Sequence, residues 1–171
     1  MSSVLFQINL FGKSVFNSIF NFVSVFLQPN QLVSTDLRKW MDKNLHNEDN
    51  IIFCGDWNVA PEPGDVALPE FYPETIACSI KEREALKNVI DWGIKDSFRI
   101  HQKNGGYYSY WDYRGGSFNV NMGYRLDHIY ITKSLIPSCV TSSIDIEPRT
   151  WPLPSDHTPV LTTLNIDKID N

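Results

Sequence analysis

The sequence has few cysteines, and their number and spacing limit the kinds of protein it can be. Cys54, Cys78 and Cys139 form an odd set with no CxxC spacing. This excludes the usual disulfide framework of a secreted domain and the common zinc-site patterns. Isolated cysteines of this kind are typical of small buried thiols in a reducing compartment, so a cytoplasmic location is expected.

The first 35 residues have almost no charge, with Lys13 alone, yet they lack the features of a signal peptide or a membrane span. A signal peptide has basic residues ahead of its apolar core and a small-residue cleavage site. A membrane-spanning helix needs about 20 mostly apolar residues. Five polar residues interrupt this stretch: Asn17, Ser18, Asn21, Ser24 and Gln28. Residues 20–27 predict a strand buried on both faces instead, and no membrane partner is expected.

Positive charge is also scarce, since the net charge is −5, but it is concentrated in residues 99–133. This stretch holds five basic residues against two acidic ones, together with Tyr107, Tyr108, Tyr110, Trp111, Tyr113 and Tyr124. Basic residues interleaved with aromatic ones are typical of phosphate contact combined with base or sugar stacking. The alternative is a solvated loop with a few core aromatic residues.

A length of 171 residues indicates one domain, and the periodicity of apolar residues predicts alternating helices and strands. A helix is expected after residues 34–36, where apolar side chains recur at helical spacing. A second is expected from the Ser79–Glu82 capping box to Gly93. Strands are expected at 51–54, 108–111, 126–132 and 160–164, with a proline-rich loop at 61–73. The fold class is therefore α/β, or α+β if the final strands pair antiparallel.

Short polar clusters follow or precede these strands at residues 55–58, 125–128 and 155–157. Asp56 and Asn58 lie two residues apart, so their side chains can share one face and suit Mg²⁺ or a phosphate-bound water. The alternative is an ordinary turn, because these residue types are common there. Asp127 and His128 must point to opposite sides of a strand. An Asp127 carboxylate orienting the His157 imidazole across strands is the more natural pairing.

Five segments carry a resemblance to a known family: residues 52–61, 91–99, 111–114, 125–129 and 154–160. Together they resemble the C-terminal half of exodeoxyribonuclease III-type apurinic/apyrimidinic endonucleases, in the endonuclease/exonuclease/phosphatase superfamily. The resemblance implies a DNase I-like sandwich of two sheets flanked by helices. It also implies Mg²⁺-dependent hydrolysis, with Mn²⁺ as an alternative ion, on duplex DNA with abasic sites or 3′ ends. The expected activities are abasic-site cleavage and 3′→5′ exonuclease action.

Carried over to this sequence, the family's roles fall on three groups of residues. The catalytic group is Asp56, Asn58, Asp127 and His157. The metal group is Asp56, Asn58, Asp156 and His157. The substrate-binding group has Tyr110, Trp111 and Tyr124 around an extrahelical sugar, with Arg114 and Arg125 from the basic stretch at the phosphates.

The N-terminal part departs from the family. Residues 36–171 match its C-terminal half, whereas residues 1–35 are an unassigned apolar segment with one predicted strand, so an N-terminally truncated domain is expected. No segment matches the family strands that supply an Asn and the main metal-binding Glu. Residues 22–30 faintly resemble a strand that carries a catalytic Tyr, with Phe26 in its place.

Two functional hypotheses follow from this departure. The first is a DNA-repair phosphodiesterase completed by a separately encoded N-terminal half or by self-association, because a sheet without its partner exposes a large apolar area. The second is a non-catalytic module that keeps the fold and weak DNA binding. A sugar-phosphate or lipid phosphatase of the same superfamily is a third option, but segments 91–99 and 111–114 favour the DNA-repair branch.

Overall fold

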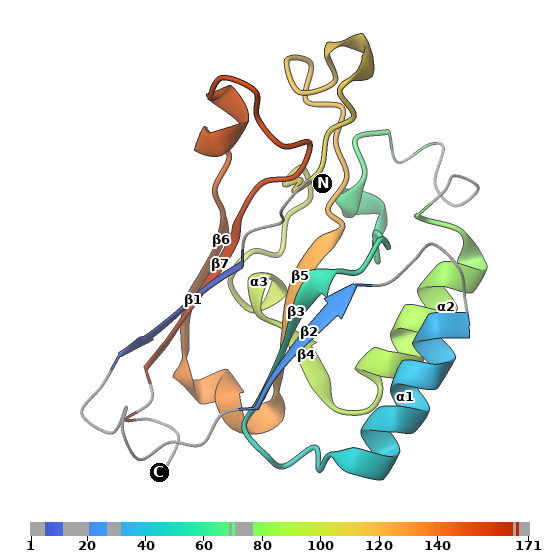
Figure 1. Ribbon diagram of the computed structural model, residues 1–171, viewed down its shortest axis with the longest axis vertical. Coiled ribbons are helices and arrows are strands. Elements are labelled where there is room, and N and C mark those ends of the chain that lie inside the picture. The colour runs from blue at the N-terminus through green and yellow to red at the C-terminus, as the bar shows by residue number, and fades with distance from the viewer. Residues whose placement is uncertain are drawn as a thin grey trace.

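The computed structural model has two small β-sheets packed face to face, with two long helices on the outer face of the larger sheet (Figure 1). It describes residues 6–11, 21–26, 32–68, 70, 77–165 and 167. The smaller sheet has the order β1-β7-β6, made of β1 (Phe6–Phe11), β7 (Val160–Asn165) and β6 (Cys139–Ile144). The larger sheet has the order β2-β3-β5-β4, made of β2 (Asn21–Phe26), β3 (Ile51–Asp56), β5 (Asp127–Thr132) and β4 (Ile94–Asp96).

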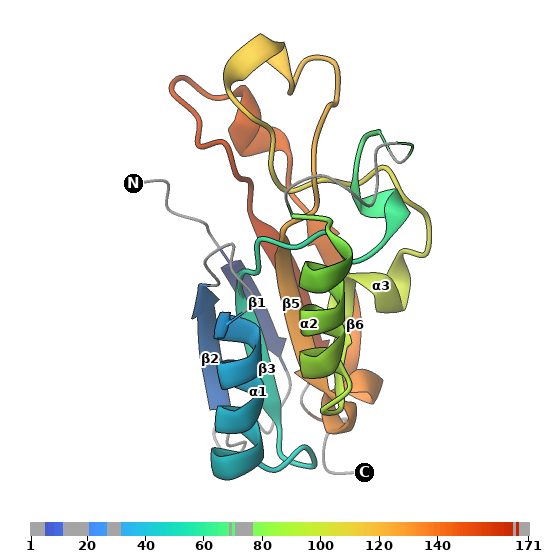
Figure 2. The same ribbon diagram turned by 90° about the vertical axis from the view of Figure 1, so that its right-hand side faces the viewer.

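The helices complete the layers. Helices α1 (Leu32–Asn44) and α2 (Ile80–Ile90) lie side by side on the larger sheet, as Figure 2 shows, whereas the short α3 (Ser97–His101) contacts β5 and β6. The 3₁₀ turns within the described residues include η1 (Pro63–Asp65), η3 (Arg114–Gly116), η4 (Lys133–Ser138) and η5 (Glu147–Thr150). None of the described helices is long and apolar enough to cross a membrane.

Alternation along the central strands divides the apolar side chains between two cores. Phe53 and Tyr130 pack toward α1 and α2, whereas Ile52, Ile129 and Ile131 pack between the sheets. Every residue of β5 is buried because both faces of this strand are covered. The strand order mixes parallel pairs (β1–β7, β2–β3) with antiparallel ones (β3–β5, β4–β5, β6–β7), so the antiparallel alternative for the final strands is the correct one.

The sequence predicts the bounds of α2 more accurately than the start of α1. The predicted capping box is present, with the Ser79 amide donating to Glu82 at 2.9 Å, and Gly93 adopts φ +124° two residues after the C-cap Asp91. Helix α1, however, begins at Leu32, before the expected start. Asp36 lies inside the helix, so residues 34–36 are not its N-terminal cap.

The predicted strand at residues 108–111 is wrong. Tyr110 forms only isolated bridges, to Tyr124 and to His157, and the chain then turns away toward η3. The segment forms single bridges to the chain ahead of β5 and ahead of β7, and it is not a strand of either sheet. Its apolar residues pack in the interior without a continuous ladder of backbone hydrogen bonds, so an apolar run could not distinguish the two arrangements.

The first 35 residues contribute an edge strand to each sheet. The expected strand is β2, which runs parallel to β3, and β1 is a second strand that pairs in parallel with β7. The register places Phe26 beside Asp56, so β2 and β3 end at the same level. That level is where the polar residues of the candidate site gather.

Candidate active site

The sheet register brings two carboxylates together at one end of the larger sheet. Asp56 is the last residue of β3 and Asp127 is the first residue of β5, and the two are antiparallel partners. Both lie on the face that carries Cys54 and Ile129, which is the face turned toward the smaller sheet. The two side chains therefore point toward the smaller sheet.

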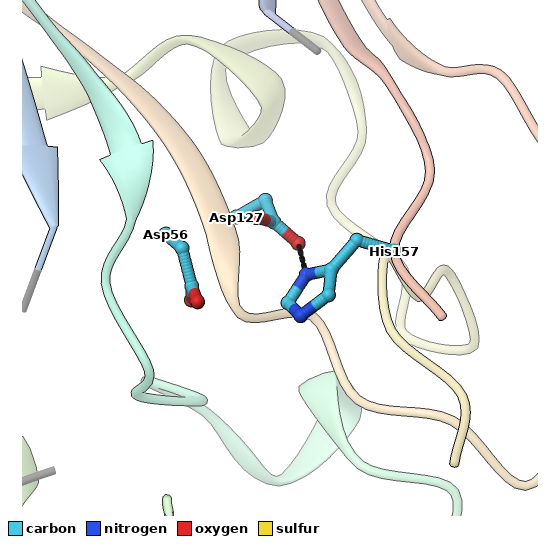
Figure 3. Close-up of side chains that lie close together, drawn as sticks. All are labelled: Asp56, Asp127 and His157. Carbon is cyan, nitrogen blue, oxygen red and sulfur yellow. Dashed lines mark hydrogen bonds and ion pairs between the residues drawn. The ribbon is translucent and has the colours of Figure 1, made fainter. Parts of the chain in front are cut away.

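The third member of the site comes from the smaller sheet. His157 lies three residues before β7, and its Nδ1 is 2.8 Å from Oδ2 of Asp127 (Figure 3). The ligand atoms of Asp56, Asp127 and His157 lie within 4.8 Å of one another. The structure thus contains the Asp127–His157 pair expected from the sequence, and this pair bridges the two sheets.

Burial and the neighbouring charge shift the protonation of two of these groups. Burial raises the pKa of Asp56 to about 6, and the negative charge of Asp127 adds to this, against the opposing effects of His157 and Asn58. Burial lowers the pKa of His157, but the hydrogen bond and charge of Asp127, together with Asp56 and Asp156, outweigh it, so the pKa of His157 is raised. The site therefore holds a carboxyl group that titrates near neutral pH beside an imidazole that favours its cationic form.

Replacing Asp56 by Asn should stabilise the fold at a pH well above 6. The folded chain holds the Asp56 proton more tightly than the unfolded chain, so stability is lost as pH rises from the ordinary pKa of 3.8 through about 6. The expected gain is about 1 kcal/mol after solvent screening is allowed for, and it disappears below the ordinary pKa. Urea unfolding across this range measures it, with the exposed Asp36→Asn as control. A constant difference at every pH would contradict the electrostatic cause.

Asn58 holds the Asp56 carboxylate on two sides. The backbone amide of Asn58 donates to Oδ1 at 3.0 Å and its side-chain amide donates to Oδ2 at 3.0 Å. Asn58 has a left-handed backbone (φ +51°), which Asn tolerates better than most residues. The structure thus places Asn58 beside Asp56, while its role in catalysis or metal binding stays a prediction.

The donor set fits a hard divalent cation through its carboxylates. Asp127 Oδ1 is buried and has no hydrogen-bond partner among the described residues, and Asp56 lies opposite it. Mg²⁺ needs only one or two carboxylates besides water and phosphate. The cluster differs from the expected metal group, because it contains Asp127 and leaves out Asp156. His157 Nδ1 is occupied by Asp127, and imidazole nitrogen is a poor ligand for Mg²⁺.

The prediction that Arg125 binds a DNA phosphate is wrong. Its side chain is 1% exposed and forms ion pairs with Asp65 and Asp96. Arg99 also turns toward Asp65, so two of the five basic residues in the 99–133 stretch neutralise a buried carboxylate. Sequence reasoning missed Asp65 because it lies in a loop 60 residues from Arg125 and belongs to no apolar pattern. Arg114, by contrast, is exposed and pairs only with its neighbour Asp112 in the contacts seen.

Of the three aromatic residues expected around a substrate sugar, two lie beside the site. The Tyr110 ring lies 4.9 Å from the His157 ring and 6.3 Å from that of Tyr124, so two half-buried tyrosines border the site. Trp111 is only 2% exposed and is covered by Phe118 and Arg149. Trp111 packs inside the loop and offers no surface to a substrate, so its expected role in substrate binding is wrong.

His128 points away from the site, as the strand alternation requires. It is fully buried, and burial together with the nearby Arg125 charge lowers its pKa to about 4. The neutral ring accepts from Arg125 at Nδ1 and donates from Nε2 to the carbonyl of Val59. His128 is therefore a structural residue, and Asp127 alone of this adjacent pair enters the site.

Comparison with known proteins agrees with this geometry. The Endonuclease/Exonuclease/phosphatase family matches residues 24–157. The chain is 31% identical over 132 residues to exodeoxyribonuclease III of Haemophilus influenzae, covering 73% of this chain and 49% of that protein. It is 34% identical over 135 residues to a DNA-(apurinic or apyrimidinic site) endonuclease of Dictyostelium discoideum, covering 77% of this chain and 36% of that protein.

Solved structures show the same fold. An AP endonuclease from Archaeoglobus fulgidus has a TM-score of 0.80 at 28% identity, with 85% of this chain and 61% of that chain covered. A 3′ phosphatase from Neisseria bound to a product DNA hairpin has a TM-score of 0.70 at 32% identity, with 78% and 50% covered. The fold is thus the DNase I-like fold of the endonuclease/exonuclease/phosphatase superfamily. Within it, the chain belongs to the exonuclease III/AP endonuclease family. It spans about half or less of the length of these curated relatives.

Proposed function

We propose that this chain supplies the proton-handling and phosphate-binding part of a Mg²⁺-dependent DNA phosphodiesterase that acts at abasic sites and 3′ ends. The observation that carries the proposal is the Asp56 carboxylate beside the Asp127–His157 pair. The named activities of the relatives support the choice of substrate. The 3′ phosphatase bound to a DNA hairpin supports DNA as the polymer.

The site residues divide the work of phosphodiester hydrolysis. Asp56 lies beside the Asp127–His157 pair and accepts a proton from the attacking water. Asn58 fixes the direction of that carboxylate. His157, whose pKa is raised by the hydrogen bond and charge of Asp127, lies against a phosphate oxygen and in its protonated form neutralises charge that develops there. A Mg²⁺ ion held by Asp56 and Asp127 would add positive charge at the phosphate.

Incision of a duplex with one abasic site tests the proposal. The 171-residue chain is incubated at high concentration with this duplex and Mg²⁺, both alone and with the complementing polypeptide described in the Discussion. The expected product is cut on the 5′ side of the site, disappears with EDTA, and disappears with Asp56→Asn. A folded chain that gives no EDTA-sensitive product under either condition would overturn the proposal.

A second candidate is a DNA-binding module without catalysis. It is favoured by one observation, that the chain spans only 49% and 36% of two catalytic relatives. The two candidates differ in a simple way. The module retains an abasic duplex in a gel shift under both conditions of the incision assay and leaves the strand intact.

Arg114→Ala should weaken duplex binding and flatten its dependence on salt. Arg114 is the exposed base on the loop that adjoins the two site tyrosines. One lost phosphate contact lowers the slope of log K against log salt by about 0.9. Fluorescence anisotropy over a series of salt concentrations measures the slope, and Arg38→Ala on α1 is the matched control. An unchanged slope would show that Arg114 is ordinary surface.

A further inference from the structure

A buried ionic cluster joins the two segments that follow Asp56 and precede Asp127. Asp65 is fully buried, and its Oδ1 accepts from Arg125 Nε at 2.6 Å while Oδ2 accepts from Arg125 Nη2 at 3.2 Å. The same guanidinium donates from Nη1 to Asp96 at 2.7 Å and to His128 Nδ1 at 2.9 Å. Arg99 makes a further ion pair with Asp65. Four of the five N–H donors of the Arg125 side chain thus have acceptors, on Asp65, Asp96 and His128.

Backbone contacts run beside this cluster and make the connection continuous. The Arg125 amide donates to the Asp65 carbonyl at 2.9 Å, and the Trp57 amide donates to the Leu126 carbonyl at 3.0 Å. His128 Nε2 lies 2.9 Å from the Val59 carbonyl oxygen. Residues 57–65 are thereby attached to residues 125–128 next to the Asp56–Asp127 pair. The β3–β5 register makes the two residues neighbours, and these attachments hold the segments that leave the sheet beside them.

A buried ionic cluster of this kind is not expected to stabilise the fold more than apolar residues would. Burying an arginine and two carboxylates costs desolvation energy, and well-packed apolar residues of similar volume are often as stable or more stable. A planar guanidinium held side-on by a carboxylate fixes orientation as well as distance, which an apolar contact does not. Orientation matters most where two like charges, Asp56 and Asp127, must be held face to face.

We propose that Asp65 and Arg125 are positioning residues, whose side-on ion pair sets the separation between Asp56 and the Asp127–His157 pair. This proposal rests on the proposed function, because the cluster is taken to position the residues of that active site. Neither residue touches the reacting atoms. The opposite arrangement, with Arg125 reaching a DNA phosphate, is excluded by its burial.

Two conservative variants test the pair. Asp65→Asn keeps the shape and removes the charge, while Arg125→Lys keeps the buried charge and removes the side-on contact. The control is Asp42→Asn, which removes the partner of Arg38 in an exposed pair on α1 that also has two short contacts (3.0 and 3.1 Å). Circular dichroism first establishes that each variant is folded.

The decisive readouts do not depend on cleavage. One is Mn²⁺ affinity, measured from the loss of the free-ion EPR signal. The other is the downfield proton resonance of the hydrogen-bonded His157 Nδ1–H. Asp65→Asn and Arg125→Lys should each lower Mn²⁺ affinity roughly 10–100-fold, which is the usual effect of losing a residue that orients metal ligands, and should broaden or remove the resonance. Asp42→Asn should change neither.

The outcomes separate this proposal from the proposed function. Wild-type Mn²⁺ affinity and an intact resonance in either folded variant would overturn the positioning role. Failure of both variants to fold would also overturn it, because the pair would then act on folding. If the wild-type chain gives no cleavage under any condition, the proposed function fails while these two measurements still decide the positioning role. Where cleavage is measurable, the variants should lower kcat by a similar factor and leave KM unchanged.

Discussion

Adding the part of Haemophilus influenzae exodeoxyribonuclease III that this chain does not match should raise cleavage of an abasic duplex by at least about a hundredfold over the 171 residues alone. The chain covers 49% of that relative. Its family resemblance implies that the main metal-binding Glu and an Asn lie in the part without a match. Magnesium sites use only one or two protein carboxylates, so the loss of one is severe. The chain alone should therefore cleave barely above background.

The sheets show where such a part could pair. Among the described residues, β1 and β2 each have a hydrogen-bonded neighbour on one side only, and Figure 2 shows both strands on the same side of the molecule. Open strand edges are natural sites for further strands. We propose that this side receives the complementing polypeptide, or a second copy of the chain if none is supplied.

Controls make the complementation decisive. The part taken from the relative must be inactive by itself. The mixture must also be inactive when this chain carries Asp56→Asn, because the proposed proton acceptor is then missing. Sedimentation of the mixture shows whether a one-to-one complex forms. Robust, EDTA-sensitive incision by the 171-residue chain alone would contradict the prediction and would mean that residues 1–35 supply what the resemblance assigns to the family's other half.

The central strands could be predicted because burial dictates their composition. Ile51 and Ile131 belong to short apolar runs that are covered on both faces, and both lie in predicted strands. Strand β6 was missed for the opposite reason, since its pattern is mostly exposed and polar. An edge strand is held by backbone hydrogen bonds to one neighbour, here β7. Its side-chain pattern therefore gives little indication that it is a strand.

The site was predictable where chemistry alone limits the choice. An Asp and a His that must pair across strands left few candidates, and the structure has Asp127 beside His157. Arg125 shows the limit of the same reasoning. A basic residue in a basic, aromatic stretch is expected at the surface unless its buried partner is known. Asp65 becomes the neighbour of Arg125 only when a loop 60 residues away folds against it. Long-range contacts of single polar residues leave no periodic signal.

Replacing His157 by Ala should lower the rate of cleavage in the complemented mixture roughly 10²–10³-fold, which is the usual cost of removing one group that stabilises charge in a transition state. Hydrogen bonding and charge from Asp127 raise the pKa of His157, so the imidazole stays cationic above its ordinary range. The wild-type rate should accordingly fall on the alkaline side as His157 loses its proton, and this limb should be missing in His157→Ala.

The partner residue gives the sharper test of mechanism. Asp127→Asn should also slow cleavage, because it weakens the hydrogen bond that orients the ring, and the double variant should be no slower than the worse of the two single variants. Such non-additivity is expected only if the two residues act as one unit. The exposed His46→Ala is the matched control and should leave the rate unchanged. Fully additive losses would show that Asp127 serves the site independently, through its second oxygen, which is buried and has no hydrogen-bond partner among the described residues.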